Sequence, residues 1–308
     1  MIRLVGFTKK YGNGYAVKDL TLKIGKGEVF GFVGPNGAGK TTTIRFLATL
    51  LKPTWGEGWV AGRSVLRDPV GVRRAIGYMP DRFGVYEGMR VWEYLDFFAL
   101  AYGIPYKQRK AVIRDVLELV DLSPMANTPA QDLSLGVRQR LCLAKTLVHD
   151  PPVLLLDEPA SGLDPRARIE IRELLKELRR MGKTILISSH ILSELAQICT
   201  TIGVIERGDL IAAGSVEDIL KEVRERRLIQ IDVLSGSNEA ERVLNSHSAV
   251  SQLERVEGTF RFEFAGDLDE VVKLQDELGD AGARILWAKE VEADLEEAFL
   301  KITKGIVS

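Results

Sequence analysis

A glycine-rich segment between an apolar run and a predicted helix carries the first residues that could do chemistry. In residues 29–42, VFGFVGPNGAGKTT, the spacing G-x-x-x-x-G-K-[ST] is filled by Gly34, Gly39, Lys40 and Thr41. Glycines tolerate positive φ and carry no side chain, so several backbone N–H groups can converge on phosphate oxygens. The Lys40 ammonium would bind β- and γ-phosphates, the Thr41 hydroxyl would ligate Mg²⁺, and the helix N-terminus adds partial positive charge. We therefore predict a nucleoside triphosphate site made by Gly34, Pro35, Asn36, Gly37, Ala38, Gly39, Lys40, Thr41 and Thr42.

Two adjacent carboxylates at the end of a second apolar run would complete the chemistry of this site. The run VLLL at 153–156 is typical of a parallel strand buried on both faces, and it ends in Asp157 and Glu158. Asp157 would hold Mg²⁺ through water, whereas Glu158 would point to the opposite side of the backbone and toward solvent. A carboxylate in the second position can orient and deprotonate a water molecule for attack on a γ-phosphate. The pair therefore predicts nucleotide hydrolysis, with Glu158 as the general base.

The elements that position these residues belong to an α/β core with two additions. Residues 2–7 and 20–24 alternate apolar and polar side chains, which predicts two strands of a half-buried antiparallel layer. Between about 83 and 148, three segments have helical apolar spacing with turns between them, which predicts a helical insertion. A further buried strand at 184–188 ends at Ser189 and His190. We therefore expect an α/β fold in which strand ends bring the polar residues together.

The pattern resets after a mixed charge run at 222–227, which we interpret as a solvated linker because acids interrupt the bases. Beyond it, strands and amphipathic segments follow in the order β-α-β-β-α-β, which predicts a small α+β, ferredoxin-like domain closed by a helix at 295–302. A chain of 308 residues should hold about two domains. We place them at 1–222 and 228–308, and the second has no recognisable catalytic residues.

Composition limits the classes of function. With 45% hydrophobic and 28% charged residues, the chain should be globular, and its net charge of −1 gives no general attraction to nucleic acid. Cys142 and Cys199 lie in helical apolar patterns, which indicates a reducing compartment without a disulfide framework. The first residues have no secretory apolar core, and no run approaches the roughly 20 apolar residues of a membrane span. A function at a membrane would therefore need another chain to cross it.

The segment LSLGV at 133–137, directly before RQR and a helix, narrows the choice among phosphate-loop proteins. Together with YG, GPNGAGKT, LLLDEP, SGLD and ISSH, in that order, it makes residues 1 to about 220 resemble the ATP-binding subunits of ABC transporters. The resemblance implies a P-loop NTPase fold with an antiparallel β layer and a helical insertion. It also implies a head-to-tail dimer with two ATP molecules, each between one phosphate loop and the partner's turn at Ser134–Gly136. A helix N-terminus approaching from the partner would close the dimer only on a triphosphate.

The resemblance also assigns roles to residues whose types alone do not settle them. His190 would contact the γ-phosphate, although a lone histidine at a strand end is usually structural. The Tyr11 ring could stack on adenine, and ordinary packing is the alternative. Asp164, a good N-cap before Pro165, would belong to the nucleotide-binding set.

Two departures from the family pattern concern this same set. The usual signature is LSGGQ, and Leu135 and Val137 replace a glycine and the glutamine, while Ser134 and Gly136 remain. Asp81 stands where the family usually has glutamine, in the loop between the core and the helical insertion. An aspartate there could reach Mg²⁺ or water, but it is shorter and charged. We expect these changes to affect rate and coupling more than activity itself.

The leading hypothesis is an ATP-binding and ATP-hydrolysing subunit that powers an ABC transporter, with an exporter favoured by the single-cassette layout. It would sit peripherally at the cytoplasmic face of the membrane, as a homodimer or heterodimer, on separate transmembrane permease subunits. Aromatic residues at 83–102, which we expect to be mostly core, would include the contact with the membrane subunit. The alternative is a soluble ABC-type switch acting on nucleic acid or the ribosome, but tandem cassettes, coiled coils and zinc modules are missing. A scaffold without turnover is disfavoured by Glu158 and His190.

Overall fold

The computed structural model describes residues 1–218, 227–256, 258–266 and 268–291. Contacts within the chain divide it into two compact units, Met1–Val216 and Glu217–Ser308. Most of the predicted charged linker and the predicted helix at 295–302 lie outside the described residues.

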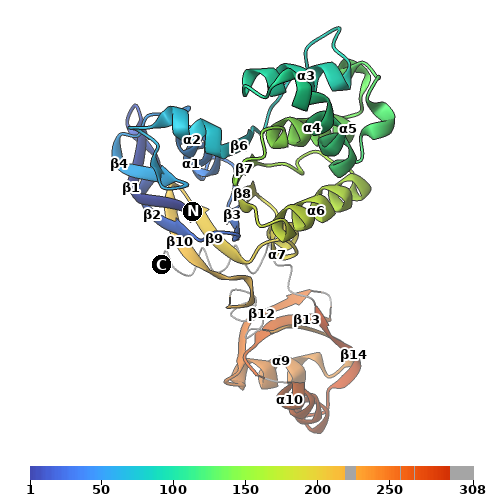
Figure 1. The fold of residues 1–308 in the computed structure, drawn as a ribbon. Helices are drawn as coiled ribbons and strands as arrows, with labels where there is room; N and C mark the ends of the chain where they lie inside the picture. Colours follow the sequence, from blue (N-terminus) through green and yellow to red (C-terminus); the bar gives the residue numbers. More distant parts are fainter. Residues whose placement is uncertain (219–226, 257, 267, 292–308) are drawn as a thin grey trace. The chain divides into compact units, whose positions relative to one another are not determined.

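A six-stranded sheet forms the centre of the first unit. Its strands are β3 (Val29–Val33), β6 (Ile76–Met79), β7 (Val153–Asp157), β8 (Thr184–Ser189), β9 (Thr201–Glu206) and β10 (Asp209–Ser215). They lie in the order β10-β9-β3-β8-β7-β6, and all neighbours are parallel except β10 and β9 (Figure 1). Every residue of β3, β7 and β8 is buried, which explains their continuous apolar runs. Because these three strands are parallel, their carboxyl ends meet at one edge of the sheet.

An antiparallel layer packs beside this sheet through helix α1 (Lys40–Leu47). Its strands are β1 (Ile2–Tyr11), β2 (Gly14–Ile24), β4 (Trp55–Val60) and β5 (Arg63–Ser64), in the order β2-β1-β4-β5. Phe46 of α1 stacks on Phe7 of β1 with ring centroids 4.3 Å apart, and both side chains are fully buried. The stack joins the layer and the helix in one hydrophobic core.

The first two strands are longer than the sequence pattern predicted. The prediction stopped β1 at residue 7 and began β2 at residue 20, so it placed Tyr11 in a turn, whereas Tyr11 is the last residue of β1. The pairing of the two strands shifts register between Leu4 and Phe7 and again beyond Phe7. Such irregularities interrupt the alternation of apolar and polar side chains, and the prediction depended on that alternation.

The predicted helical insertion lies at one end of the first unit (Figure 1). It contains α3 (Val91–Ala101), α4 (Tyr106–Leu119), two short 3₁₀ turns (Ser123–Met125 and Ala130–Asp132) and α5 (Leu135–Leu147). The expectation that its aromatic residues are mostly core is wrong. Tyr94 is buried, but Tyr86, Trp92 and Phe97 are exposed. Helix α3 has more apolar residues than positions that face neighbouring elements, so some of its aromatic side chains remain on the surface.

Three further helices of the first unit are α2 (Pro69–Ala75), α6 (Pro165–Arg180) and α7 (Leu192–Ala196). Helix α6 begins where the sequence predicts, because Asp164 caps it and Pro165 occupies its first position. Its apolar stripe, Ile171, Leu174, Leu175 and Leu178, is buried, while charged residues occupy the other side.

The second unit has its own sheet and core. Its elements are β11 (Arg227–Ser235), α9 (Ser237–Ser246), β12 (Val250–Val256), β13 (Thr259–Phe264), α10 (Leu268–Asp280) and β14 (Arg284–Val291). The strands lie in the order β12-β13-β11-β14, and every pair is antiparallel. Phe260, Phe262 and Phe264 are fully buried in a cluster formed only by residues of this unit.

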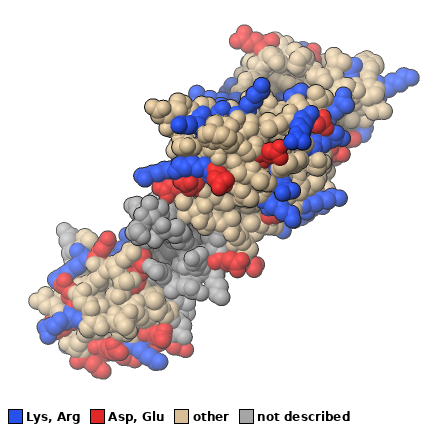
Figure 2. All heavy atoms as spheres, turned by 90° about the vertical axis from the view of Figure 1, so that its left-hand side faces the viewer, with Lys and Arg blue, Asp and Glu red and all other residues tan. Residues whose placement is uncertain are grey.

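The surface carries charged side chains of both signs (Figure 2). Figure 2 shows Lys and Arg side chains interspersed with Asp and Glu side chains on one face of the molecule. A mixed pattern of this kind creates no large field of one sign on that face. Within the described ranges, each helix is too short or too polar to span a lipid bilayer.

Candidate active site

The phosphate loop joins the buried strand β3 to helix α1, as its sequence predicts. Gly39 precedes the first helical residue with a φ of 115°, a conformation that favours glycine. At Gly34 the restriction is space, because a Cβ there would lie 2.1 Å from the carbonyl oxygen of Ile205 in β9. The loop therefore packs against β9 at its start and turns into α1 at its end. The N–H groups of the first turn of α1 are left without helical partners and can bind an anion.

Lys40 is held over this loop. Its side chain is only 6% exposed. Its ammonium donates to the carbonyl oxygens of Gly34, at 2.5 Å, and Pro35, at 3.2 Å. It also lies 3.3 Å from Oε1 of Glu158. Oxygen partners on two sides hold the Lys40 ammonium at the start of α1, where it can meet a phosphate group.

Asp157 lies at the end of β7 beside Thr41. Its Oδ1 accepts hydrogen bonds from the Thr41 hydroxyl at 3.1 Å and from the Ser188 hydroxyl at 2.7 Å. Its Oδ2 is buried and has no hydrogen-bond partner. Burial raises the pKa of Asp157, and the negative charges of Asp81 and Glu158 add to the rise, against the two hydrogen bonds. A hydroxyl beside an orphaned buried carboxylate oxygen is a donor set that fits Mg²⁺.

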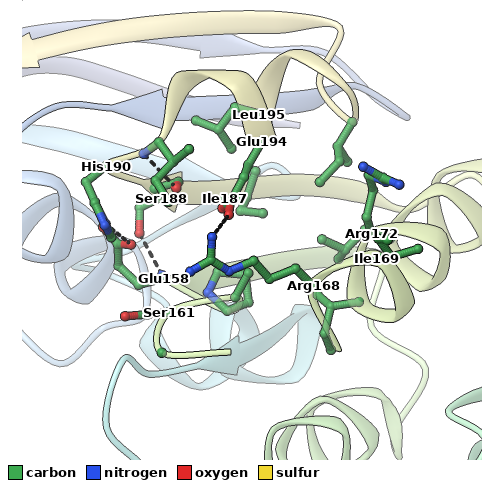
Figure 3. Close-up of a pocket in the computed structure, with 18 of the residues that line it drawn as sticks. Glu158, Ser161, Arg168, Ile169, Arg172, Ile187, Ser188, His190, Glu194 and Leu195 are labelled. Carbon is green, nitrogen blue, oxygen red and sulfur yellow. Dashed lines mark hydrogen bonds and ion pairs between the residues drawn. The ribbon is translucent and has the colours of Figure 1, made fainter. Parts of the chain in front are cut away.

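Glu158 leaves the strand with a left-handed backbone, at a φ of 50°. Its N–H donates to the Ser188 hydroxyl at 3.0 Å, and its Oε2 lies 2.9 Å from Nδ1 of His190 (Figure 3). The side chain is only 12% exposed, so the expectation that it points toward solvent is wrong. The unusual backbone conformation turns it between Lys40 and His190 instead.

One cavity of about 550 Å³ brings most of the predicted residues together. Its lining comprises Asn36, Gly37, Ala38, Gly39, Lys40, Thr41, Thr42, Asp81, Arg82, Glu158, Ser161 and His190. It thus combines a glycine-rich loop, two basic side chains, two carboxylates and an imidazole. This set can bind phosphate groups and activate a water molecule beside them.

Seven predicted residues do not line this cavity. Gly34, Pro35 and Asp157 contact its lining, because they accept hydrogen bonds from Lys40 or Thr41. The other four are Tyr11, Ser134, Gly136 and Asp164. The Tyr11 ring is 55% exposed, with the Lys9 ammonium 5.0 Å from its centroid. Ser134 is the exposed N-cap of α5, and its hydroxyl accepts from the N–H of Val137 at 3.5 Å. Gly136 lies in the first turn of the same helix. Asp164 accepts from two N–H groups of α6, each at 3.0 Å, so its carboxylate serves as a helix cap.

The structure adds residues that the sequence reasoning missed. Ser188 donates to Asp157 and accepts from the Glu158 N–H, so it connects the two acidic positions. A hydroxyl residue near the end of the buried strand β8 was the available signal. Arg82 and Ser161 also line the cavity, and their position beside predicted motif residues was their only signal.

Comparisons with known proteins decide the family. A family model described as ABC transporter matches residues 17–161. An uncharacterized ABC transporter ATP-binding protein of Bacillus subtilis, YhcH, is 35% identical over 98% of this chain and 96% of its own length. This chain belongs to the ABC transporter ATP-binding proteins. The linearmycin resistance ATP-binding protein LnrL of the same species is 31% identical, and the match covers 98% of each chain.

A solved ABC structure shares the fold of the first unit. The dimeric, post-hydrolysis ATP-binding cassette MJ0796, bound to ADP and Pi, is 28% identical with a TM-score of 0.64. The match covers 70% of this chain and 99% of that one. The predicted family and the predicted ABC ATPase fold are confirmed. As a member of the family, the chain binds ATP and hydrolyses it, and none of these similarities supports a switch acting on nucleic acid or the ribosome.

Proposed function

We propose that this ABC ATPase drives export by closing two cassettes on ATP beneath a separate membrane-spanning subunit. The observation that carries the proposal is the convergence of Lys40, Glu158 and His190 on one cavity at the end of the sheet. The direction of transport is supported by relatives. The Nod factor export ATP-binding protein I of Mesorhizobium japonicum is 34% identical over 98% of this chain and 86% of its own length.

In this proposal each residue of the cavity has a separate task. The Lys40 ammonium binds the terminal phosphates, and Glu158 accepts a proton from the attacking water. His190 holds one oxygen of Glu158, so the carboxylate keeps its orientation when Lys40 turns to phosphate. Thr41 and Asp157, with Asp81 across the cavity, would hold Mg²⁺, which when bound neutralises charge on the phosphate oxygens.

The partner cassette would complete each site through the turn at Ser134–Gly136. Ser134 is exposed and lies outside the cavity of its own chain, although it begins helix α5. The N-terminus of α5 carries partial positive charge and free N–H groups, which suit a phosphate brought by another subunit. Either a second copy or a related cassette would serve as the partner.

The substitution Ser134→Arg should block ATP-driven dimerisation without weakening ATP binding to the monomer. The long side chain would occupy the place of the partner's phosphate while leaving the cavity of its own chain unchanged. Gel filtration with ATP and a nucleotide titration separate the two effects. Ser123→Arg, at another exposed helix start of the insertion, is the matched control. A Ser134→Arg protein that dimerises normally would place the turn away from the interface.

We assign the contact with the membrane subunit to a second cavity, of about 520 Å³, between the sheet core and the helical insertion. Leu50, Ile76, Phe98 and Tyr102 give it apolar walls, and Arg73, Arg74 and Lys145 give it basic ones. It suits an amphipathic segment with at least one acidic side chain, and it lies on the insertion whose aromatics are exposed. Such a contact would hold the chain peripherally at the cytoplasmic face of the membrane.

We also propose that the two units are separately folding domains, with the second supporting dimerisation or regulation. Truncation after Arg227 should leave a folded core that binds ATP, because the two core clusters share no residue. The fragment 227–308 should melt cooperatively by itself, which calorimetry can measure. Aggregation of the truncated core together with an unfolded fragment would mean that the units depend on one hydrophobic core.

A further inference from the structure

A pocket separate from the two cavities above lies behind Glu158 and His190, between helices α6 and α7 and the end of β8; we call it the α6–α7 pocket. Its volume is about 360 Å³. Glu158, Ser161 and His190 line this pocket and also line the phosphate cavity. The Glu158–His190 pair is therefore a wall that two cavities share. Figure 3 shows this pair among the residues that line the α6–α7 pocket.

The pocket is mainly apolar. Its walls are made by Ile169, Ile171, Leu175, Ile187, Leu195 and Ile198. Most of these side chains are buried, but Ile169 is 49% exposed, so the apolar wall reaches the surface. The volume lies at the small end of the range for ligand pockets, about 300–1,000 Å³. It suits a compact apolar body of up to three rings.

Two arginines of α6 border the pocket, and their charges are satisfied differently. Arg168 crosses to α7, where it lies 3.1 Å from the carboxylate of Glu194, and it donates to the carbonyl oxygen of Leu163 at 2.9 Å (Figure 3). Its charge is neutralised at close range. Arg168 and Glu194 thus tie the two helices together across the pocket.

Arg172 lacks an equivalent partner among the described residues. One of its terminal nitrogens donates to the neutral amide of Gln197, and its buried Nε has no hydrogen-bond partner. Its nearest carboxylate is Glu173 at 3.6 Å, and Glu173 also binds Lys176 at 3.0 Å. Two cations therefore share one acid here. An added anion beside Arg172 would find both an available donor and uncompensated positive charge.

We propose that this pocket is a regulatory site for a small amphiphilic anion, with an aromatic or aliphatic body and one carboxylate or sulfonate group. The body would occupy the apolar walls, and the anionic group would bind Arg172. Because Glu158 and His190 form the far wall, occupancy would shift the carboxylate that must meet water. The ligand would then lower kcat while leaving the KM for ATP unchanged. This inference goes beyond the proposed function, although its kinetic part rests on the assigned role of Glu158.

The test uses the full chain and the fluorescent probe 8-anilinonaphthalene-1-sulfonate. The probe is titrated into the protein in the presence of saturating ADP, which fills the phosphate cavity. The Arg172→Gln variant should bind the probe about tenfold more weakly, because a hydrogen bond to a charged group is lost. Arg180→Gln, on the same helix at a side chain that is 72% exposed, should bind like the unmodified chain. N-phenyl-1-naphthylamine, the same body without the sulfonate, should not distinguish the two variants.

Binding and turnover are measured separately, so failure of this inference differs from failure of the proposed function. Equal probe affinity in the unmodified chain, Arg172→Gln and Arg180→Gln would overturn the site. Loss of bound probe when ADP is added to a sample without ADP would also overturn it. Binding that depends on Arg172 but raises the KM for ATP would overturn the regulatory role. A cavity-filling Leu195→Phe variant gives an independent check, since it should weaken both probes while Arg172 remains.

Discussion

Replacing Glu158 by glutamine should leave ATP binding intact and slow ATP hydrolysis about 10²–10⁴-fold, the usual loss when a general base is removed. Glutamine has nearly the same size and can still meet His190, which lies 2.9 Å from the carboxylate. It cannot accept a proton from water. The nucleotide would therefore stay intact, and the ATP-bound dimer should accumulate.

Single-turnover hydrolysis and gel filtration with ATP measure the two parts of this prediction. Glu170→Gln, at a half-buried residue of α6 that pairs with Arg140 and Arg166, changes the charge by the same amount away from the cavity. It should hydrolyse ATP at the normal rate. Turnover near the normal rate in Glu158→Gln would show that another residue is the base.

The Lys40→Ala variant should lose tight ATP binding, by about 10²-fold or more, because hydrogen bonds to charged groups contribute about 1.5–3 kcal/mol each. Among the described residues, Arg82 is the one Lys or Arg besides Lys40 in the lining of the cavity, and it belongs to the loop after β6 and not to the phosphate loop. The change also leaves Oε1 of Glu158, which is buried, without the cation 3.3 Å away.

Titration with a fluorescent ATP analogue measures this loss directly. Lys176→Ala on α6 is a suitable control, because that ammonium pairs with Glu173 outside the cavity. The control should bind the analogue normally. Unchanged affinity in Lys40→Ala would refute the assignment of the phosphate loop.

The sequence was most informative where local chemistry dictates local structure. The phosphate loop could be predicted because its glycines, lysine and threonine act within one strand–loop–helix unit. The strands that lead to Gly34, Asp157 and His190 have apolar cores that mark them as buried, and parallel pairing brings their ends to one edge. The family resemblance added the order of the motifs, and the comparisons confirm the fold class to which it pointed.

The sequence was less informative where distant contacts decide. The full length of β1 and β2 depends on irregular pairing that no local pattern records. The orientation of Glu158 depends on a left-handed backbone residue and on Ser188, 30 positions away. The exposure of Trp92 and Phe97 follows from which side of α3 faces its neighbours. Each of these features is a property of tertiary packing, which overrides local preference.

Mixing the Lys40→Ala and Ser134→Arg proteins is the most direct test of whether each ATP site is shared by two chains. In a mixed dimer, the intact phosphate loop of the Ser134→Arg chain would face the intact turn of the Lys40→Ala chain. We expect the mixture to recover ATP hydrolysis that neither variant has alone, in proportion to the fraction of mixed dimers. Absence of any recovery, with both proteins folded and Ser134→Arg still binding ATP, would contradict a site shared by two chains.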